Sequence, residues 1–223
     1  MAVLTVILFA NGDYKNPNFY LEYLSKYNSK EYYVICADGG ANHALSLGLT
    51  PDMVVGDLDS LDDVVCQRLT GSKCQFHKFP SAKNESDLEL AMKHALDLKP
   101  REIIVFGATG GRMDHAFANI MLLMLPLSRG IKTVIVDEIH EMQLMDKELT
   151  VEGIPGDFVS LFPLTAEAQG VVTRGLKYPL KNETLYVSAS RGLSNELTGS
   201  IAHISITQGC LLVVKVKKEQ ASF

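Results

Sequence analysis

Apolar, β-branched runs alternate with helical patterns from the start of the chain to about residue 138. The clearest helical pattern covers residues 86–98, where apolar residues recur every three or four positions. Shorter helical patterns cover residues 19–27, 41–47 and 61–69, and a further one ends near Leu127. The runs expected as strands are residues 3–10, 32–38, 52–57, 101–108 and 132–138. Strands that are apolar throughout and alternate with helices predict an α/β fold, with a mostly parallel sheet covered by helices on both faces.

The pattern changes near residue 140. Helical periodicity disappears, and short β-rich runs are separated by glycine and proline turns. These runs are residues 142–151, 158–164, 170–178, 184–190, 203–208 and 210–217. Regularly spaced short strands of this kind predict a small all-β sandwich. We therefore expect two domains, residues 1–143 and residues 144–223.

Composition narrows the function classes. Of the 223 residues, 47% are hydrophobic and 21% are charged, which is typical of a globular protein with a sizeable core. The net charge of −5 argues against binding along a nucleic-acid backbone, which requires a basic surface. We therefore expect no nucleic-acid partner.

The cysteines and the first residues bear on the compartment. Cys36, Cys66, Cys74 and Cys210 are scattered, without a CxxC pair. In a chain of this length they indicate free thiols in a reducing compartment, so we expect a cytoplasmic protein. The apolar residues 2–10 lack the basic flank of a signal peptide and are too few to span a bilayer. A buried first strand, with no membrane partner, explains them better.

Polar residues and glycines gather where four predicted strands end, and ligands of open parallel sheets bind beyond the carboxyl ends of strands. The first cluster is Asp38, Gly39 and Gly40. The glycines allow close approach of a ligand to the backbone, and the start of the next helix favours an anion. A plain strand-to-helix turn capped by Asp38 explains the same residues.

The second cluster is Asp57 and Asp59, two carboxylates one residue apart at the end of an apolar run. Alternate residues of an extended segment point the same way, so both carboxylates can face one ion. Mg²⁺ takes oxygen ligands, often one or two carboxylates together with substrate phosphates. Helix capping explains Asp59 or Ser60 but not Asp57.

The third cluster is Lys83 and Asp87, at the entry to the helix predicted over residues 86–98. Negative charge in a first helical turn is favourable by itself, so a charged helix entry is a sufficient explanation. However, if Asp87 faces Asp57 and Asp59, the three carboxylates repel one another unless a cation lies between them.

The fourth cluster is Gly110, Gly111, Arg112 and Asp114. A glycine-rich turn before a helix can hold phosphate, and arginine offers phosphate a planar pair of donors. The segment is not a GxxxxGK[ST] loop. A loop that ends in a helix capped by Asp114 is the alternative.

Taken in order, these clusters resemble the thiamin pyrophosphokinase family. The similarity lies in DGGAN (38–42), GDLDS (56–60), Lys83 with Ser86 and Asp87, and GGRMDH (110–115). It continues in TRGLKYPL (173–180) and SNE (194–196). The resemblance implies a nucleotide-binding catalytic domain at 1–143 and a thiamin-binding β-sandwich at 144–223. It also implies an ATP-dependent thiamin diphosphokinase, which transfers a diphosphoryl group from ATP to the thiamin hydroxyl, releases AMP and requires Mg²⁺.

The resemblance also assigns residues. The expected catalytic and Mg²⁺-binding residues are Asp57, Asp59 and Asp87. The chemistry of the residues adds a hypothesis of its own: Asp59 or Asp87 accepts the proton of the thiamin hydroxyl, directly or through water. The expected nucleotide-binding residues are Asp38, Gly39, Gly40, Asn42, Lys83, Gly110, Gly111, Arg112 and Asp114. The expected thiamin-binding residues are Tyr178, Ser194 and Asn195, where Tyr178 takes a position that is often tryptophan in the family. The resemblance further implies a homodimer with the active site at its interface.

Two other functions use the same residues. A phosphatase of the haloacid dehalogenase type carries DxD[ST] after an apolar strand and uses the first aspartate, here Asp57, as its nucleophile. That motif normally opens the chain, whereas here it follows the third predicted strand. A non-catalytic protein that binds nucleotide or thiamin is the second alternative, although a pure binding protein has little need of three carboxylates.

Overall fold

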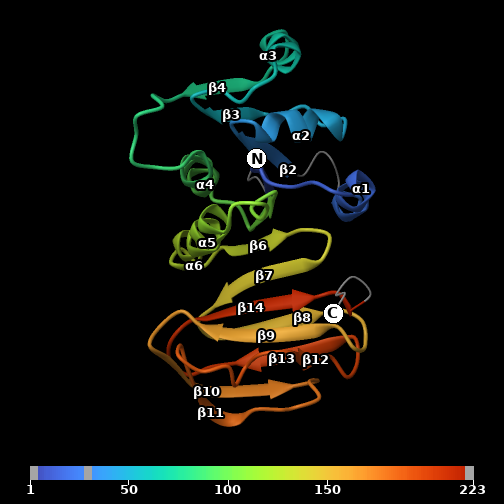
Figure 1. The fold of residues 1–223 in the computed structure, drawn as a ribbon, viewed down its shortest axis with the longest axis vertical. Helices are drawn as coiled ribbons and strands as arrows, with labels where there is room; N and C mark the ends of the chain where they lie inside the picture. Colours follow the sequence, from blue (N-terminus) through green and yellow to red (C-terminus); the bar gives the residue numbers. More distant parts are fainter. Residues whose placement is uncertain (1–4, 28–31, 219–223) are drawn as a thin grey trace. The chain divides into compact units, whose positions relative to one another are not determined.

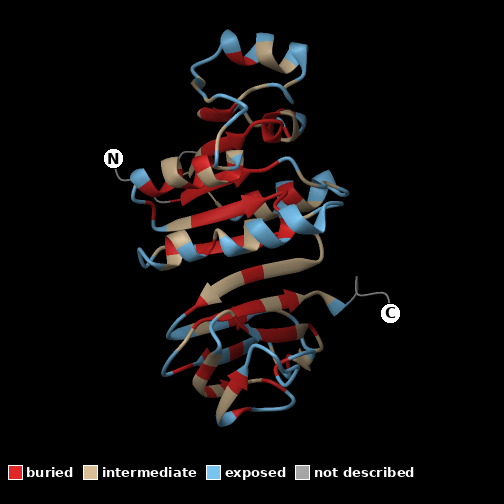
Figure 2. Cartoon of the chain, turned by 60° about the vertical axis from the view of Figure 1, so that its left-hand side comes forward, coloured by how far each residue is buried: buried red, intermediate tan, exposed pale blue. Residues whose placement is uncertain are grey.

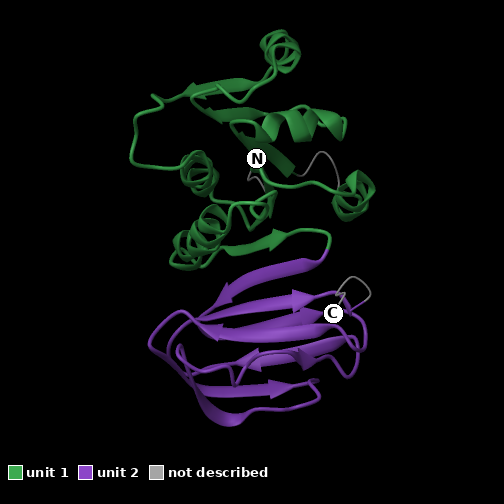
Figure 3. Ribbon diagram, in the orientation of Figure 1, with its two compact units in different colours: residues 1–138 green, residues 139–223 purple. Residues whose placement is uncertain are grey.

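The computed structural model describes residues 5–27 and 32–218. The chain divides into two compact units, residues 1–138 and residues 139–223 (Figure 3). The boundary expected from sequence, between residues 143 and 144, falls within strand β7 (His140–Met145).

Unit 1 contains a parallel sheet whose strand order is β6-β5-β1-β2-β3-β4 (Figure 1). Its strands are β1 (Thr5–Phe9), β2 (Tyr32–Ala37), β3 (Met53–Gly56), β4 (Gln75–Lys78), β5 (Glu102–Phe106) and β6 (Lys132–Val136). The first predicted strand is thus found as β1, while Val3 and Leu4 lie outside the described residues. Strand β1 is central and fully buried, with β2 on one side and β5 on the other.

Helices cover both faces of this sheet. They are α1 (Pro17–Leu24), α2 (Gly40–Ser46), α3 (Asp63–Thr70), α4 (Asp87–Asp97), α5 (Met113–Met121) and α6 (Met124–Leu127). Ile7 and Phe9 of β1 point to one face, where they share a core with Tyr20 of α1 and Ala44 of α2. Helix α4 packs against β1, β2 and β3 through an apolar stripe that lies outside this core. Figure 2 shows the central strands buried between these layers.

The strongest predicted helix, residues 86–98, begins where the sequence indicates. The Ser86 hydroxyl accepts a hydrogen bond from the Glu89 N–H at 3.2 Å and so caps α4. The apolar positions Leu88, Ala91 and Met92 are buried, as their spacing predicts. This cap fixes where α4 starts, and therefore where Asp87 lies.

Unit 2 is built from antiparallel strands in two layers. One layer has the order β12-β9-β14-β7 and the other β11-β10-β13-β8. Beyond β7, the strands are β8 (Glu148–Glu152), β9 (Phe158–Pro163), β10 (Glu167–Arg174), β11 (Lys181–Tyr186), β12 (Asn195–Glu196), β13 (Ile201–Ser205) and β14 (Leu211–Val216). Leu161 and Val213 of the first layer share an apolar core with Val171 and Ala202 of the second. The predicted fold class, an α/β unit followed by a β-sandwich, is confirmed.

Within residues 5–27 and 32–218, every helix is too short or too polar to cross a bilayer.

Candidate functional site

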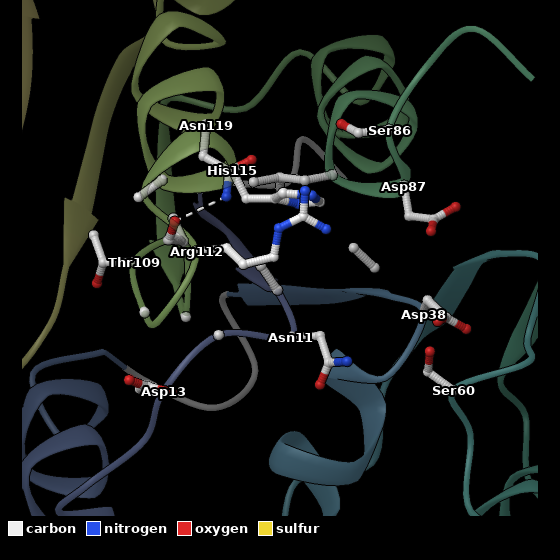
Figure 4. A pocket seen from close by; sticks show the side chains of 18 of the residues that line it. Asn11, Asp13, Asp38, Ser60, Ser86, Asp87, Thr109, Arg112, His115 and Asn119 are labelled. Carbon is white, nitrogen blue, oxygen red and sulfur yellow. Dashed lines mark hydrogen bonds between the residues drawn. The ribbon is translucent and has the colours of Figure 1, made fainter.

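A cavity of about 660 Å³ opens in unit 1 at the carboxyl ends of its parallel strands (Figure 4). Its walls come from the segments that follow β1, β2, β3, β4 and β5, from the first turn of α4 and from α5. Seven residues expected at a nucleotide or metal site line it. They are Asp38, Asp57, Lys83, Asp87, Gly110, Gly111 and Arg112.

Three carboxylates converge at one end of this cavity, which Asp38 and Asp57 line and Asp59 does not. One oxygen atom from each of Asp38, Asp57 and Asp59 lies within 4.8 Å of the others. Asp38 has a positive φ of 45°, which turns its side chain into this group, and it is only 7% exposed. Its Oδ1 atom is buried without a hydrogen-bond partner in the described part of the chain. An unsatisfied buried carboxylate oxygen beside two others fits a cation with oxygen ligands.

Asp57 is held in its charged form. The pKa of its carboxyl group lies below the ordinary value, first because the Ser81 hydroxyl interacts with it and then because of the Asp59 N–H. That N–H donates to Asp57 Oδ1 at 3.3 Å. Donors that favour the ionised form keep Asp57 available as a ligand at neutral pH.

Asp87 lies beside this group and is paired with a cation of the protein. Its Oδ1 is 2.9 Å from Lys83 Nζ, and the pKa of Lys83 is raised above its ordinary value, first by this interaction with Asp87. A Cβ atom built on Gly56 would lie 2.9 Å from the Asp38 Cβ and 3.1 Å from Asp87 Oδ1. The absent side chain of Gly56 therefore lets Asp38 and Asp87 approach the same point. The structure groups Asp57 and Asp59 with Asp38, and the role of Asp87 as a metal ligand stays a prediction.

Arg112 stands at the start of α5 with its guanidinium group partly engaged. Its Nε donates to Asp114 Oδ1 at 3.2 Å, and both side chains are exposed. The guanidinium lowers the pKa of Asp114 to about 2. Arg112, and not Asp114, occupies the N-cap position of α5, and Asp114 does not line the cavity. The Arg112 fork is therefore held in place by Asp114 while it faces the cavity.

Several predicted nucleotide-binding residues do not line the cavity and make structural contacts instead. The Asn42 side chain donates to the Ser60 carbonyl at 3.0 Å and accepts from the Asp62 N–H at 3.3 Å, so it ties α2 to the loop after β3. A Cβ on Gly40 would lie 2.1 Å from the Phe9 carbonyl oxygen. A Cβ on Gly39 would lie 2.6 Å from the side-chain amide of Asn11. Their roles toward a nucleotide stay predictions.

The sequence reasoning missed one wall of the cavity. Asn11, Gly12 and Asp13 line it directly after β1, together with Thr109 after β5. Asn11 to Asp13 follow an apolar strand, as the four predicted clusters do, so the same rule of strand ends points to them. Their loop-like composition hid that signal.

Unit 2 brings together two of the predicted thiamin-binding residues. The Asn195 side chain accepts from the Tyr178 N–H at 3.0 Å and donates to the Tyr178 carbonyl at 2.7 Å. Tyr178 is 55% exposed. Next in the chain, Ser194 has a positive φ of 54°, and its N–H donates to Ser160 Oγ at 3.0 Å. An exposed aromatic ring on a fixed backbone is suited to a flat ligand.

Each of the two units matches a known protein-family model. The family model "Thiamin pyrophosphokinase, catalytic domain" matches residues 24–135, and "Thiamin pyrophosphokinase, vitamin B1 binding domain" matches residues 141–211. The thiamine pyrophosphokinase of Bacillus subtilis (strain 168) is 29% identical over 213 residues, which cover 95% of this chain and 98% of that protein.

Solved structures agree with these matches. The crystal structure of thiamine pyrophosphokinase from Bacillus subtilis has a TM-score of 0.85 and 27% identity, covering 96% of this chain and 99% of that one. That of thiamin pyrophosphokinase from Geobacillus thermodenitrificans has a TM-score of 0.82 and 26% identity, covering 98% and 100% of the two chains.

Proposed function

Because the chain belongs to the thiamin pyrophosphokinase family, we propose that it is an ATP-dependent thiamin diphosphokinase. It transfers a diphosphoryl group from ATP to the thiamin hydroxyl and yields thiamin diphosphate and AMP. The observation that carries this function is a cavity lined by Asp38, Asp57, Lys83 and Arg112, with the Asp59 carboxylate grouped beside the first two. Such a cavity combines ligands for a cation with cations for phosphate, as phosphoryl transfer requires.

The carboxylate group fits Mg²⁺. Asp38, Asp57 and Asp59 would hold the ion, since their oxygens converge and the buried Asp38 oxygen is otherwise unsatisfied. When bound, Mg²⁺ would neutralise charge on the ATP phosphates. Asp87, which shares the space at Gly56 with Asp38, remains the proposed further ligand.

The residues of the chain supply positioning and charge. Lys83 and Arg112 would bind phosphate oxygens, and the N–H groups at the start of α5 would add donors. The thiamin hydroxyl oxygen bonds to the β-phosphorus of ATP, and the bond from that phosphorus to the bridging oxygen of AMP breaks. AMP leaves with this oxygen, and Asp59 or Asp87 accepts the hydroxyl proton.

Product identity tests this function. The purified protein is incubated with ATP, Mg²⁺ and thiamin, and the nucleotides and thiamin phosphates are separated and quantified. We expect AMP and thiamin diphosphate in equal amounts, and no AMP when thiamin is left out. ADP together with thiamin monophosphate would contradict diphosphoryl transfer.

The same assay distinguishes the proposed function from the two alternatives. A phosphatase that uses Asp57 is not favoured, because both family models that match are thiamin pyrophosphokinase domains. In the assay, such a phosphatase would release phosphate from ATP even when thiamin is left out. A non-catalytic binding protein would give no product at all, and it leaves the convergent carboxylates of unit 1 without a use.

Tyr178 is the proposed contact for the thiamin rings, with Ser194 and Asn195 beside it. Replacing Tyr178 with alanine is expected to raise the KM for thiamin about fivefold, because an aromatic pair contributes roughly 1 kcal/mol beyond buried area. The KM for ATP should not change. Steady-state kinetics with each substrate varied in turn measures both values.

Two variants serve as controls for Tyr178. Phenylalanine at this position keeps the ring and should keep the KM for thiamin. Alanine at Tyr186, whose ring is 52% exposed on the same unit, should leave both KM values unchanged. Equal effects of the alanine variants at Tyr178 and Tyr186 would argue against a specific ring contact.

The homodimer and the cytoplasmic location are also part of the proposal. Unit 2 exposes apolar side chains at Ile154, Leu193 and Ile201, a kind of surface that interfaces bury. The four cysteines are free thiols, as expected in a reducing compartment. A mass of one chain, 24.5 kDa, for the active species in light scattering would contradict the homodimer.

A further inference from the structure

Strand order places a crevice between β1 and β5. The chain runs from β1 to β2, β3 and β4 on one side of the sheet, and from β5 to β6 on the other. The two strands are neighbours, with Phe9 beside Phe106 at their carboxyl ends. Nucleotides in open parallel sheets bind where the strand order reverses in this way. The crevice opens between the residues that follow β1 and those that follow β5.

These two loops are fixed against each other by their backbones. The Ala10 N–H donates to the Phe106 carbonyl at 2.9 Å, and the Asp13 N–H donates to the Thr109 carbonyl at 3.1 Å. A Cβ on Gly12 would lie 2.2 Å from the carbonyl oxygens of Gly107 and Thr109. The backbone of Asp13 is therefore held at the crevice independently of its side chain.

The Asp13 carboxylate is available for a ligand. Asp13 is exposed and lines the cavity, and within residues 5–27 and 32–218 its carboxylate has neither a hydrogen bond nor an ion pair. The neighbouring Thr109 hydroxyl is already engaged, since it donates to Asp137 at 2.8 Å. Figure 4 shows Asp13 and Thr109 on one side of the cavity, and Asp38, Ser60 and Asp87 on the other.

Charge decides which part of a nucleotide lies beside Asp13. The cations that line the described part of the cavity, Lys83 and Arg112, suit the phosphates. An unpaired carboxylate repels phosphate but accepts strong hydrogen bonds from hydroxyl groups. In dinucleotide-binding sheets an acidic side chain on a neighbouring segment accepts a hydrogen bond from the ribose 2′-hydroxyl, so a carboxylate beside the crevice suits this contact.

We infer that Asp13 accepts hydrogen bonds from the ribose hydroxyls of ATP, and that it makes the enzyme prefer ribonucleotides over 2′-deoxynucleotides. This inference rests on the proposed function, in which ATP is the phosphate donor. It assigns a specificity role to a residue that the clusters around Asp57 and Arg112 leave out.

The test compares ATP with 2′-deoxy-ATP in the parent protein and in Asp13→Ala. The parent should show a KM for ATP about tenfold or more below that for 2′-deoxy-ATP, since a hydrogen bond to a charged group contributes on that scale. Asp13→Ala should raise the KM for ATP by about the same factor and bring the two values together, with kcat little changed. Asp146→Ala, at an exposed turn of unit 2, is the control and should retain the preference.

Two outcomes would overturn the inference. One is a parent protein with the same KM for ATP and 2′-deoxy-ATP. The other is an Asp13→Ala variant in which the KM values for ATP and 2′-deoxy-ATP rise by the same factor, so that the preference is kept. Asp13→Asn is the second variant in case alanine prevents folding; it keeps the shape and should lose most of the preference.

Binding without thiamin separates this inference from the proposed function. Calorimetric titration with ATP and 2′-deoxy-ATP needs no turnover. A protein that forms no thiamin diphosphate, yet binds ATP more tightly than 2′-deoxy-ATP in a manner that depends on Asp13, would contradict the function and support the ribose contact. An active enzyme that binds ATP and 2′-deoxy-ATP equally would support the proposed function and contradict the ribose contact.

Discussion

Asp57→Asn is expected to lower kcat for thiamin diphosphate formation by about 10²-fold or more, the scale seen when a group that stabilises transition-state charge is removed. The substitution keeps the size of the side chain and removes its negative charge. The native carboxyl is ionised at neutral pH, and its pKa is lowered further, first by Ser81 and then by the Asp59 N–H. The charge lost is therefore one that the working enzyme carries.

A dependence on Mg²⁺ concentration separates a metal ligand from a structural role. With fewer anionic oxygens, Asp57→Asn should need a higher Mg²⁺ concentration for half-maximal rate than the parent. Asp97→Asn, on the exposed end of α4, is the matched control and should behave as the parent. Near-parental turnover in Asp57→Asn would contradict a role for Asp57 in the active site. Reduced turnover with an unchanged Mg²⁺ dependence would contradict its role as a metal ligand.

Gly40→Ala is expected to destabilise unit 1 by about 3 kcal/mol or more, at the upper end of the cost of overpacking. The added Cβ would lie 2.1 Å from the Phe9 carbonyl oxygen and 2.6 Å from its carbon. Phe9 belongs to the fully buried central strand, so its backbone has no space into which to move. For a chain of this length the loss corresponds to a fall in Tm of about 6–12 °C.

The control for Gly40 is Gly111→Ala, since a Cβ at Gly111 would have no atom within 4 Å. Thermal unfolding followed by circular dichroism should show a lowered Tm for Gly40→Ala and a near-parental Tm for Gly111→Ala. A Gly40→Ala protein that melts like the parent but binds ATP weakly would return Gly40 to the nucleotide site, the role that sequence resemblance assigns to it.

The fold could be predicted where burial is uniform along an element. The strands β1, β3 and β5 are buried at nearly every residue, so their apolar runs stand out. Strand β4 has no apolar run that stands out in the sequence, because its residues QFHK lie at the edge of the sheet and are exposed or half-buried. The run 142–151 was expected as one element and forms β7 and β8, because the turn at Asp146 and Lys147 contains neither glycine nor proline.

The site could be predicted as far as shared strand ends allow. Asp57, Lys83, Asp87 and Arg112 converge because parallel strands open their carboxyl ends at one edge of a sheet. The grouping of Asp38 with Asp57 depends on a positive φ, which sequence does not reveal for an aspartate.

Two further features lay beyond the sequence pattern. Gly40 and Asn42 belong to a glycine-containing turn that suits phosphate. However, Asn42 contacts Ser60 and Gly40 contacts Phe9 of the chain itself. Those contacts depend on how α2 packs against the loop after β3 and against β1, so residue type and spacing do not distinguish them from ligand contacts.

The paired hydrogen bonds between Asn195 and Tyr178 have a consequence for affinity. Both backbone groups of Tyr178 are held by one amide, at 3.0 and 2.7 Å, before any ligand arrives. The loss of backbone freedom at Tyr178 thus accompanies folding and does not accompany association. A flat ligand that meets this ring encounters a preorganised surface, so more of the contact energy appears as affinity.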